Sequence, residues 1–262
     1  MRLESGEELP FVIDTGAFVT VIDSSLTNWL GHYRGNAVGG SFVGKVAQDM
    51  AVHEAHRLYL GDTLLQTSKL VVATDLSATS RRHPIKGILG MDCLRNYCVQ
   101  LDFERREIRF LDPGKLNLED LGDPFLLELE KSPLGGASVY ADIVLAGQKA
   151  RFFVDTGFSS DGDLIFEPAL FQRLVDMYVP ERTGVNTMFG QATWRVAELS
   201  SVTMGGRKYE CLKVGEMPPK VVNAPAWMSL RFLARHQVTF NFPQRVMFLK
   251  LRAGLASDKG IK

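Results

Sequence analysis

The sequence predicts an all-β protein made of two similar halves, and three observations support this fold class. An internal repeat covers nearly the whole chain. Strand-like runs are short and are bounded by Gly, Pro and Asp. Helical periodicity is clear only over residues 167–178, with a shorter counterpart at residues 25–30. Many short strands with few helices are typical of a barrel-like β domain, which this chain contains twice.

The repeat consists of four blocks that recur in the same order at a nearly constant spacing. Residues 11–17 (FVIDTGA) recur 141 residues later as residues 152–158 (FFVDTGF). The other blocks pair Gly6 with Gly147, residues 60–62 with 204–206, and residues 94–103 with 233–242. Because small insertions between the blocks fall in loops, we interpret the chain as two copies of one domain.

The junction between the copies is predicted in residues 112–124, a polar segment with two prolines and two glycines. We therefore expect one lobe at residues 1–118 and a second at 119–262, related by pseudo-twofold symmetry. The second copy has a strand-like run before its first hairpin, whereas the first copy begins almost inside that hairpin. This difference leads us to expect that the native protein extends upstream or is processed, which mass spectrometry of its N-terminus tests.

Three hairpins are predicted from β-rich runs on either side of a short turn. They join residues 140–145 to 149–154, residues 100–103 to 107–111, and residues 238–242 to 246–251. The last two occupy equivalent places in the two copies, as the repeat requires.

Composition excludes several classes of protein. The chain has 30 Lys+Arg and 30 Asp+Glu, so no general attraction to nucleic acid or anionic lipid is expected. No apolar run reaches the roughly 18 residues of a membrane helix, and residues 1–13 lack the order of a signal peptide. We expect a soluble protein whose compartment, cytoplasmic or periplasmic, stays open. Its three cysteines form no CxxC pair and are expected to be small buried hydrophobes.

The candidate chemistry lies in the two Asp-Thr-Gly segments. Each follows apolar strand residues, and the glycine permits a tight turn that holds the carboxylate at the end of the strand. Pseudo-twofold symmetry would set Asp14 opposite Asp155. Two adjacent carboxyls share one proton, so one can activate a water while the other protonates a peptide carbonyl, with no metal or covalent intermediate. Thr15 and Thr156 are expected to hydrogen-bond to the backbone of the opposite loop.

The chain resembles an aspartic protease of the retropepsin or pepsin type. The resemblance is carried by the two apolar-Asp-Thr-Gly segments, by glycine-bearing segments after them, and by residues 87–94 (GILGMDCL) before a strand. It implies an acid-protease fold, similar to a double-psi β-barrel, with the active site between two lobes of a monomeric pseudo-dimer. It also implies an aspartic endopeptidase with a peptide or protein substrate and no cofactor. The implied site comprises catalytic Asp14 and Asp155 and supporting Thr15, Gly16, Thr156 and Gly157.

The resemblance further implies a flap hairpin in each half and a substrate-binding role for the residues after Asp-Thr-Gly. The flaps are expected at residues 38–43 and 187–191. The predicted substrate-binding residues are Ala17, Phe158, Gly39, Gly40, Met188, Phe189 and Gly190.

Two features depart from the pepsin pattern. Ala17 and Phe158 stand where pepsin-like enzymes place a serine. Loss of its hydroxyl would raise the pKa values of the dyad and shift the pH optimum above that of a gastric enzyme. Phe158 is also expected to crowd the cleft floor, which would narrow specificity or disable the enzyme. Ser229 of the second copy stands where the first copy has Gly90. This tolerable divergence puts the geometry of the second half in doubt.

Two other interpretations remain open at the level of sequence. One is a catalytically weak or inactive protease-like module that binds peptides, and the other is pairing of each copy with a copy from another chain. The segment His53-Glu54-Ala55-His56 has the wrong spacing for a metalloprotease helix, and it lies in strand-like sequence. We interpret it as a solvated face, and no metal site is predicted.

Overall fold

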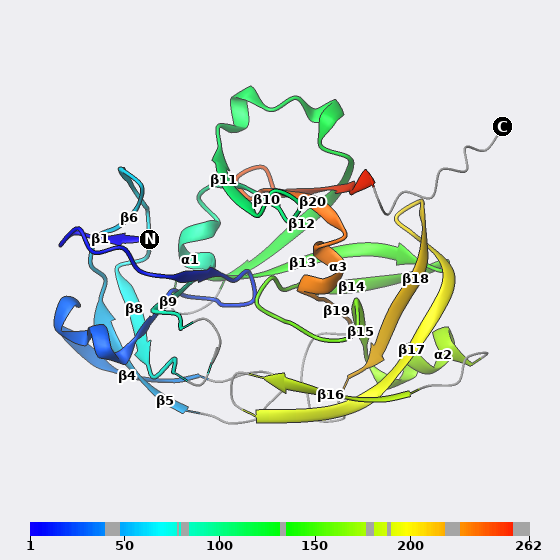
Figure 1. Cartoon of the computed structure of the whole chain (residues 1–262), viewed down its shortest axis with the longest axis horizontal. Helices are drawn as coiled ribbons and strands as arrows, with labels where there is room; N and C mark the ends of the chain where they lie inside the picture. Colours follow the sequence, from blue (N-terminus) through cyan, green and yellow to red (C-terminus); the bar gives the residue numbers. More distant parts are fainter. Residues whose placement is uncertain are drawn as a thin grey trace.

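The computed structural model describes residues 1–39, 48–77, 79, 84–131, 135–176, 181–187, 190–217 and 226–253, with the side chains of residues 48 and 181–194 left aside. It is mostly β and forms two lobes (Figure 1). We call β1 to β11 the first lobe and β12 to β21 the second lobe. The all-β, two-lobe prediction is thereby confirmed, while the exact boundary at residues 118 and 119 stays a prediction.

The elements of the first lobe are β1 (Arg2–Leu3), β2 (Phe11–Ile13), β3 (Val21–Asp23), η1 (Ser24–Trp29), β4 (Tyr33–Gly39), β5 (Gln48–Glu54), β6 (Leu58–Leu60), β7 (Thr63–Leu64), β8 (Leu70–Thr74), β9 (Gly87–Leu89), α1 (Met91–Leu94), β10 (Cys98–Asp102) and β11 (Glu107–Leu111). Two short 3-10 helices follow, η2 (Pro113–Lys115) and η3 (Leu118–Asp120).

The elements of the second lobe are β12 (Asp123–Lys131), β13 (Ala137–Leu145), β14 (Gln148–Val154), β15 (Leu164–Phe166), α2 (Pro168–Val175), β16 (Glu181–Thr187), β17 (Gly190–Met204), β18 (Arg207–Glu216), β19 (Ala226–Met228), α3 (Leu230–Leu233), β20 (His236–Asn241) and β21 (Val246–Leu251). The three predicted hairpins are present as β13–β14, β10–β11 and β20–β21.

The two lobes contain the same arrangement of strands around the Asp-Thr-Gly loop. In the first lobe β2 pairs in parallel with β9, β9 pairs antiparallel with β3, and β3 pairs in parallel with β8. In the second lobe β14, β19, β15 and β18 repeat these three pairings in the same senses. The sequence repeat therefore corresponds to a structural repeat.

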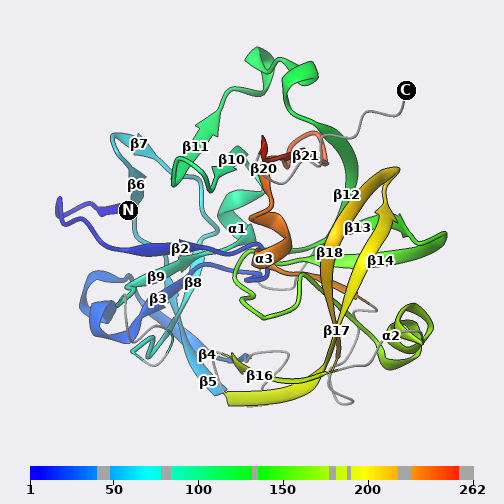
Figure 2. The same ribbon diagram turned by 45° about the vertical axis from the view of Figure 1, so that its right-hand side comes forward.

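The lobes are joined by antiparallel pairing of β10 with β20 (Figure 2). Gln100 lies opposite Thr239 in this pairing, and the two side chains are hydrogen-bonded at 3.0 Å. These residues are equivalents in the two copies, because 139 positions separate them as they separate the last blocks of the repeat. An antiparallel pair of equivalent residues is the relationship that a pseudo-twofold axis produces.

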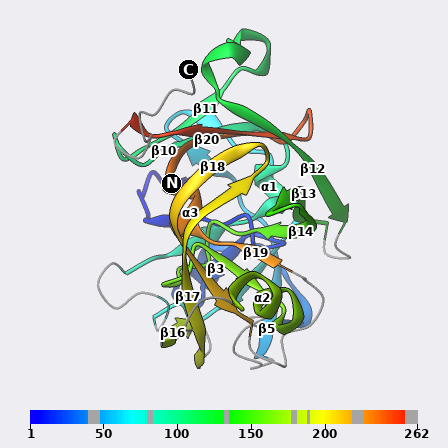
Figure 3. The same cartoon turned by 90° about the vertical axis from the view of Figure 1, so that its right-hand side faces the viewer.

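The hairpins β4–β5 and β16–β17 reach the same side of the molecule, away from β10 and β20 (Figures 1 and 2). They are the places predicted for the flaps. In each lobe the Asp-Thr-Gly loop comes first in the sequence, the hairpin follows it, and the strand that takes part in the β10–β20 pairing comes last. Seen from the side, β17 and β18 form the long outer hairpin of the second lobe (Figure 3).

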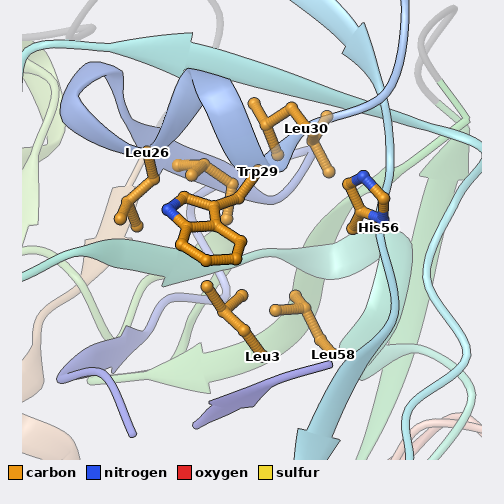
Figure 4. A pocket seen from close by; sticks show the side chains of 8 residues that line it. Leu3, Leu26, Trp29, Leu30, His56 and Leu58 are labelled. Atoms are coloured by element: carbon orange, nitrogen blue, oxygen red, sulfur yellow. The ribbon is translucent and has the colours of Figure 1, made fainter. Parts of the chain in front are cut away.

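Helices α1 and α3 lie in the middle of the molecule, whereas α2 lies at its periphery (Figure 2). Helix α2 lies within the helix predicted for residues 167–178, and it buries Leu170, Phe171 and Val175. Its counterpart η1 buries Leu26 over a small apolar cavity of about 10 Å³ that Trp29 partly covers (Figure 4). A space of that size holds at most one water molecule, so it is a packing gap of the first lobe.

Among the described residues, no helix combines the length and the apolar character that crossing a membrane requires.

Candidate active site

Asp14 and Asp155 are each held at the end of a strand by the same backbone hydrogen bond. The Asp14 N–H donates to the carbonyl of Leu89 at 3.1 Å, and the Asp155 N–H donates to the carbonyl of Met228 at 3.1 Å. Both acceptors are the last residues of the strands that pair in parallel with β2 and β14. The parallel pairing therefore fixes the position of each aspartate at the end of its strand.

The predicted hydrogen bonds of the two threonines across the lobes are present. The N–H of Thr15 donates to Oγ1 of Thr156 at 2.9 Å, and the N–H of Thr156 donates to Oγ1 of Thr15 at 3.0 Å. Each hydroxyl in turn donates to a carbonyl of the opposite strand, Thr15 to Val154 at 2.7 Å and Thr156 to Ile13 at 2.9 Å. Both threonines are buried, so these four bonds lock the two loops together in the absence of competing solvent.

Gly16 and Gly157 allow the two loops to approach closely. A Cβ atom on Gly16 would overlap the carboxyl of Asp155, and one on Gly157 would overlap the carboxyl of Asp14. The neighbouring N–H groups also bind the carboxylates: Gly16 donates to Oδ1 of Asp14 at 2.7 Å, and Gly157 donates to Oδ1 of Asp155 at 2.9 Å. Both positions therefore require glycine, because a side chain would overlap the opposite carboxyl.

The two carboxyls hydrogen-bond to one another, and both pKa values are raised. Burial is the largest cause for each. For Asp155 the negative charge of Asp14 adds to burial and places its pKa well above the ordinary value of 3.8. Backbone N–H groups oppose the rise at Asp14. The pair therefore keeps one proton at a pH where two exposed carboxyls would both be ionised.

Ala17 and Phe158 have no hydroxyl that could bind the carboxylates. Their backbone N–H groups bind them instead. The N–H of Ala17 donates to Oδ1 of Asp14 at 3.2 Å, and the N–H of Phe158 lowers the pKa of Asp155 by a hydrogen bond. The Phe158 ring packs edge-on against Trp227 with centroids 4.9 Å apart. The ring thus packs on buried side chains of the second lobe next to Asp155.

Ser229, whose effect on the second half the sequence leaves open, is accommodated by hydrogen bonds to the neighbouring backbone. Its N–H donates to the carbonyl of Asp163 at 3.1 Å. Its hydroxyl lies 2.8 Å from the carbonyl of Gly162 and 2.9 Å from that of Asp163, where its single proton is shared. The next residue, Leu230, donates to Phe158 just as Met91 donates to Ala17 in the first lobe. The backbone geometry is the same in both lobes.

Sequence reasoning missed the buried polar groups behind the two loops. In the first lobe, Thr20 donates to Asp92 at 2.8 Å, and both side chains are buried. In the second lobe, Asp163 is fully buried and binds the guanidinium of Arg235 at 2.9 and 3.1 Å. The repeat aligns Asp92 with Arg231, which also lies 3.4 Å from Asp163. The sequence signal for these groups was the replacement of the acid Asp92 by the base Arg231 at equivalent positions of the repeat.

The predicted flap residues are only partly described. Gly39 ends β4, and Gly190 begins β17, opposite Thr187. Gly40, Met188 and Phe189 lie outside the described residues. The two hairpins agree with the predicted flaps, and a role in substrate binding stays a prediction for all five residues.

His53 and His56 do not form a metal site with their neighbours. His53 Nδ1 lies 3.2 Å from the carbonyl of Gly31. Over the part of the chain that the structure describes, no three His, Cys, Asp or Glu side chains are grouped to hold a metal ion.

Comparisons with known proteins identify the fold of the chain. No family model matches the sequence, and no curated protein matches it. Among solved structures, the chain is similar to basic 7S globulin from soybean, with a TM-score of 0.53 and 11% sequence identity. The alignment covers 93% of this chain and 88% of the globulin. That protein has a pepsin-like fold, so the chain has one too.

Proposed function

We propose that the protein is an aspartic endopeptidase that hydrolyses peptide bonds with a water activated between Asp14 and Asp155. The observation that carries the proposal is the reciprocal fit of the two loops. Each glycine leaves room only for the opposite carboxyl, and the two carboxyls share a hydrogen bond. A fold alone would not require that fit.

The raised pKa of Asp155 suggests how the two carboxyls divide the work. Ionised Asp14 takes a proton from the water while the water oxygen bonds to the peptide carbonyl carbon. Protonated Asp155 gives its proton to the carbonyl oxygen as the tetrahedral intermediate forms. As the intermediate collapses, Asp14 gives its proton to the nitrogen and the C–N bond breaks, while a hydroxyl of the intermediate returns its proton to Asp155 as the carbonyl of the acid product re-forms. The two carboxyls end with one proton between them, as they began.

The chain supplies both carboxyls, so we propose a monomer as the active unit. An extended peptide would bind between the hairpins β4–β5 and β16–β17 and the Asp-Thr-Gly loops by strand-like hydrogen bonds. Sedimentation of the active species tests this point, since activity confined to a dimer would contradict it.

Digestion of a peptide library tests the reaction. We expect cleavage that pepstatin-type inhibitors block, and a fall of about 10³-fold or more in both Asp14→Asn and Asp155→Asn. Asp62→Asn is the matched control, because this carboxylate is fully exposed beside Arg2. Folding of each variant is checked by circular dichroism. Equal inertness of wild type and Asp14→Asn would refute the enzyme and favour the peptide-binding module.

A further inference from the structure

The walls on the two sides of the dyad are built from equivalent positions with different side chains. We define the lobe-one wall as Val12, Ala17, Val21 and Ile88, and the lobe-two wall as Phe153, Phe158, Ile165 and Trp227. The repeat aligns the first, second and last members, and strand pairing aligns the remaining one: Val21 lies opposite Ile88, as Ile165 lies opposite Trp227.

Both walls lie beside the carboxyls. Val12 and Phe153 precede the aspartates by two residues, which in an extended strand places them on the same face as the carboxyl. Ala17 and Phe158 follow the aspartates by three residues, and their N–H groups hydrogen-bond to the carboxylates. A side chain next to a reacting peptide bond would therefore rest on one of these walls.

The lobe-one wall is open. Val12, Ala17 and Val21 are each partly exposed, while Leu76, Ile85 and Ile88 form the buried base on which they pack. All of these side chains are aliphatic. They form an apolar surface that is partly exposed.

The lobe-two wall is filled. Phe153, Ile165 and Trp227 are only 3%, 1% and 3% exposed. The Phe158 ring stacks edge-on against Trp227, and Phe18 of the first lobe packs against the same group. The second lobe thus carries the large aromatic side chains of Phe153, Phe158 and Trp227 where the first lobe has smaller aliphatic ones.

We propose, on the basis of the endopeptidase function above, that the enzyme selects a large apolar side chain on one side of the scissile bond and a small one on the other. The large side chain rests on the lobe-one wall. The lobe-two wall admits only a small side chain, and Phe158 is the residue that sets this limit. Because the lobes are related by a pseudo-twofold axis, they face opposite sides of the bond that is cut.

Two peptides of identical composition test the proposal. They carry the central pair Phe-Ala in one and Ala-Phe in the other, between the same flanking residues. Differences in pocket filling of this size change kcat/KM by about 10- to 200-fold. We therefore expect wild type to cleave one order at least about 10-fold better than the other. Phe158→Ala should raise cleavage of the poor order, and Ala17→Phe should lower cleavage of the good one.

Controls separate specificity from folding and from the proposed reaction. Phe110→Ala removes an aromatic ring from β11, where it packs on Tyr97 away from both walls, and should leave the ratio unchanged. Phe158→Leu serves if the alanine variant fails to fold. Equal cleavage of the two orders by wild type, or an unchanged ratio in the folded Phe158 variants, would overturn the proposal.

A wild type that cut no peptide in any library would count against the proposed function, and the asymmetry would then be measured by binding. The same two peptides, with a hydroxyethylene group in place of the central amide, would be titrated calorimetrically into wild type and Phe158→Ala. A preference for one order that Phe158→Ala reduces would support the asymmetric walls without catalysis. Equal affinity, or no binding of either peptide, would refute them.

Discussion

Behind the aspartate of the first lobe, a hydroxyl on the loop donates to an acid on the helix, Thr20 to Asp92. Behind the aspartate of the second lobe, the acid is on the loop and the base is on the helix, Asp163 with Arg231. Two backbone hydrogen bonds are nevertheless shared by the lobes, from the aspartate to the end of the parallel strand and from the first helical residue to the residue after Asp-Thr-Gly. The comparison shows that the backbone geometry around the dyad is constrained, whereas the side chains that hold it are interchangeable as long as each buried polar group is paired.

The largest loss of stability is expected when Gly90 is changed to the serine that the second lobe has at the equivalent position. A Cβ atom there would lie 2.5 Å from the backbone of Val19, so Gly90→Ser should cost several kcal/mol or prevent folding. Ser229→Gly should cost only about 1–2 kcal/mol, the loss of one buried hydroxyl hydrogen bond. Urea unfolding of both variants measures the difference. A Gly90→Ser protein as stable as wild type would show that the two loops are alike in space as well as in backbone.

The next effect concerns the two buried acids. Asp163→Asn leaves the guanidinium of Arg235 without its carboxylate, which should cost about 3 kcal/mol. Asp92→Asn keeps an oxygen acceptor for Thr20 but loses the acceptor for the N–H of Ser68, so it should cost about 1–1.5 kcal/mol. Equal losses of unfolding free energy in the two variants would contradict the view that the lobes use different chemistry.

A third difference is a titrating group that only the second lobe has at this place. His236 is buried where the first lobe has Tyr97, and burial lowers its pKa to about 4 from 6.5. Its hydrogen bonds to Phe232 and Tyr209 fit a neutral ring with the proton on Nδ1. The folded state binds fewer protons than the unfolded state, so stability should fall by about 3 kcal/mol as pH drops from about 6.5 to about 4.

His236→Gln tests that source of acid sensitivity. The amide oxygen can still accept from Tyr209, but it does not titrate. We expect a flatter profile of unfolding free energy against pH in the acid range. A slope like that of wild type would place the sensitivity in other groups.

The smallest expected effect on stability comes from the dyad, and its sign is opposite. The raised pKa values of Asp14 and Asp155 mean that the folded state holds extra protons, so their contribution is lost as pH rises through those values. Asp155→Asn should flatten this loss. Activity should peak above pH 3.8, the ordinary carboxyl value, and a maximum below about pH 3 would contradict the raised pair.

The sequence predicted the parts of the site that recur. Asp14, Asp155 and the two threonines could be found because the repeat aligns them, and the cross-lobe hydrogen bonds followed from that alignment. The supports behind the loops could not be found in this way. Asp92 and Asp163 occupy different elements, and an insertion in the second copy hides that they serve equivalent loops.

Sequence reasoning left the effect of Ser229 open for a related reason. Glycine at Gly90 is required because the backbone of Val19 is close, and that distance is set by tertiary packing. In the second lobe, Gly162 and Asp163 present two carbonyls that accept from the hydroxyl, so a side chain is stabilised there. The residue at one position of a sequence repeat does not reveal whether the neighbouring backbone leaves space for a side chain.

The threonine bonds between the loops have a consequence for heat inactivation. Four hydrogen bonds of the threonines cross between the lobes, and neither lobe holds both carboxyls by itself. A slight parting of the lobes on warming would disconnect the acids while both barrels kept their ellipticity. Catalysis would then fade at a lower temperature than the circular dichroism signal, and the gap between the two curves would report the strength of the junction.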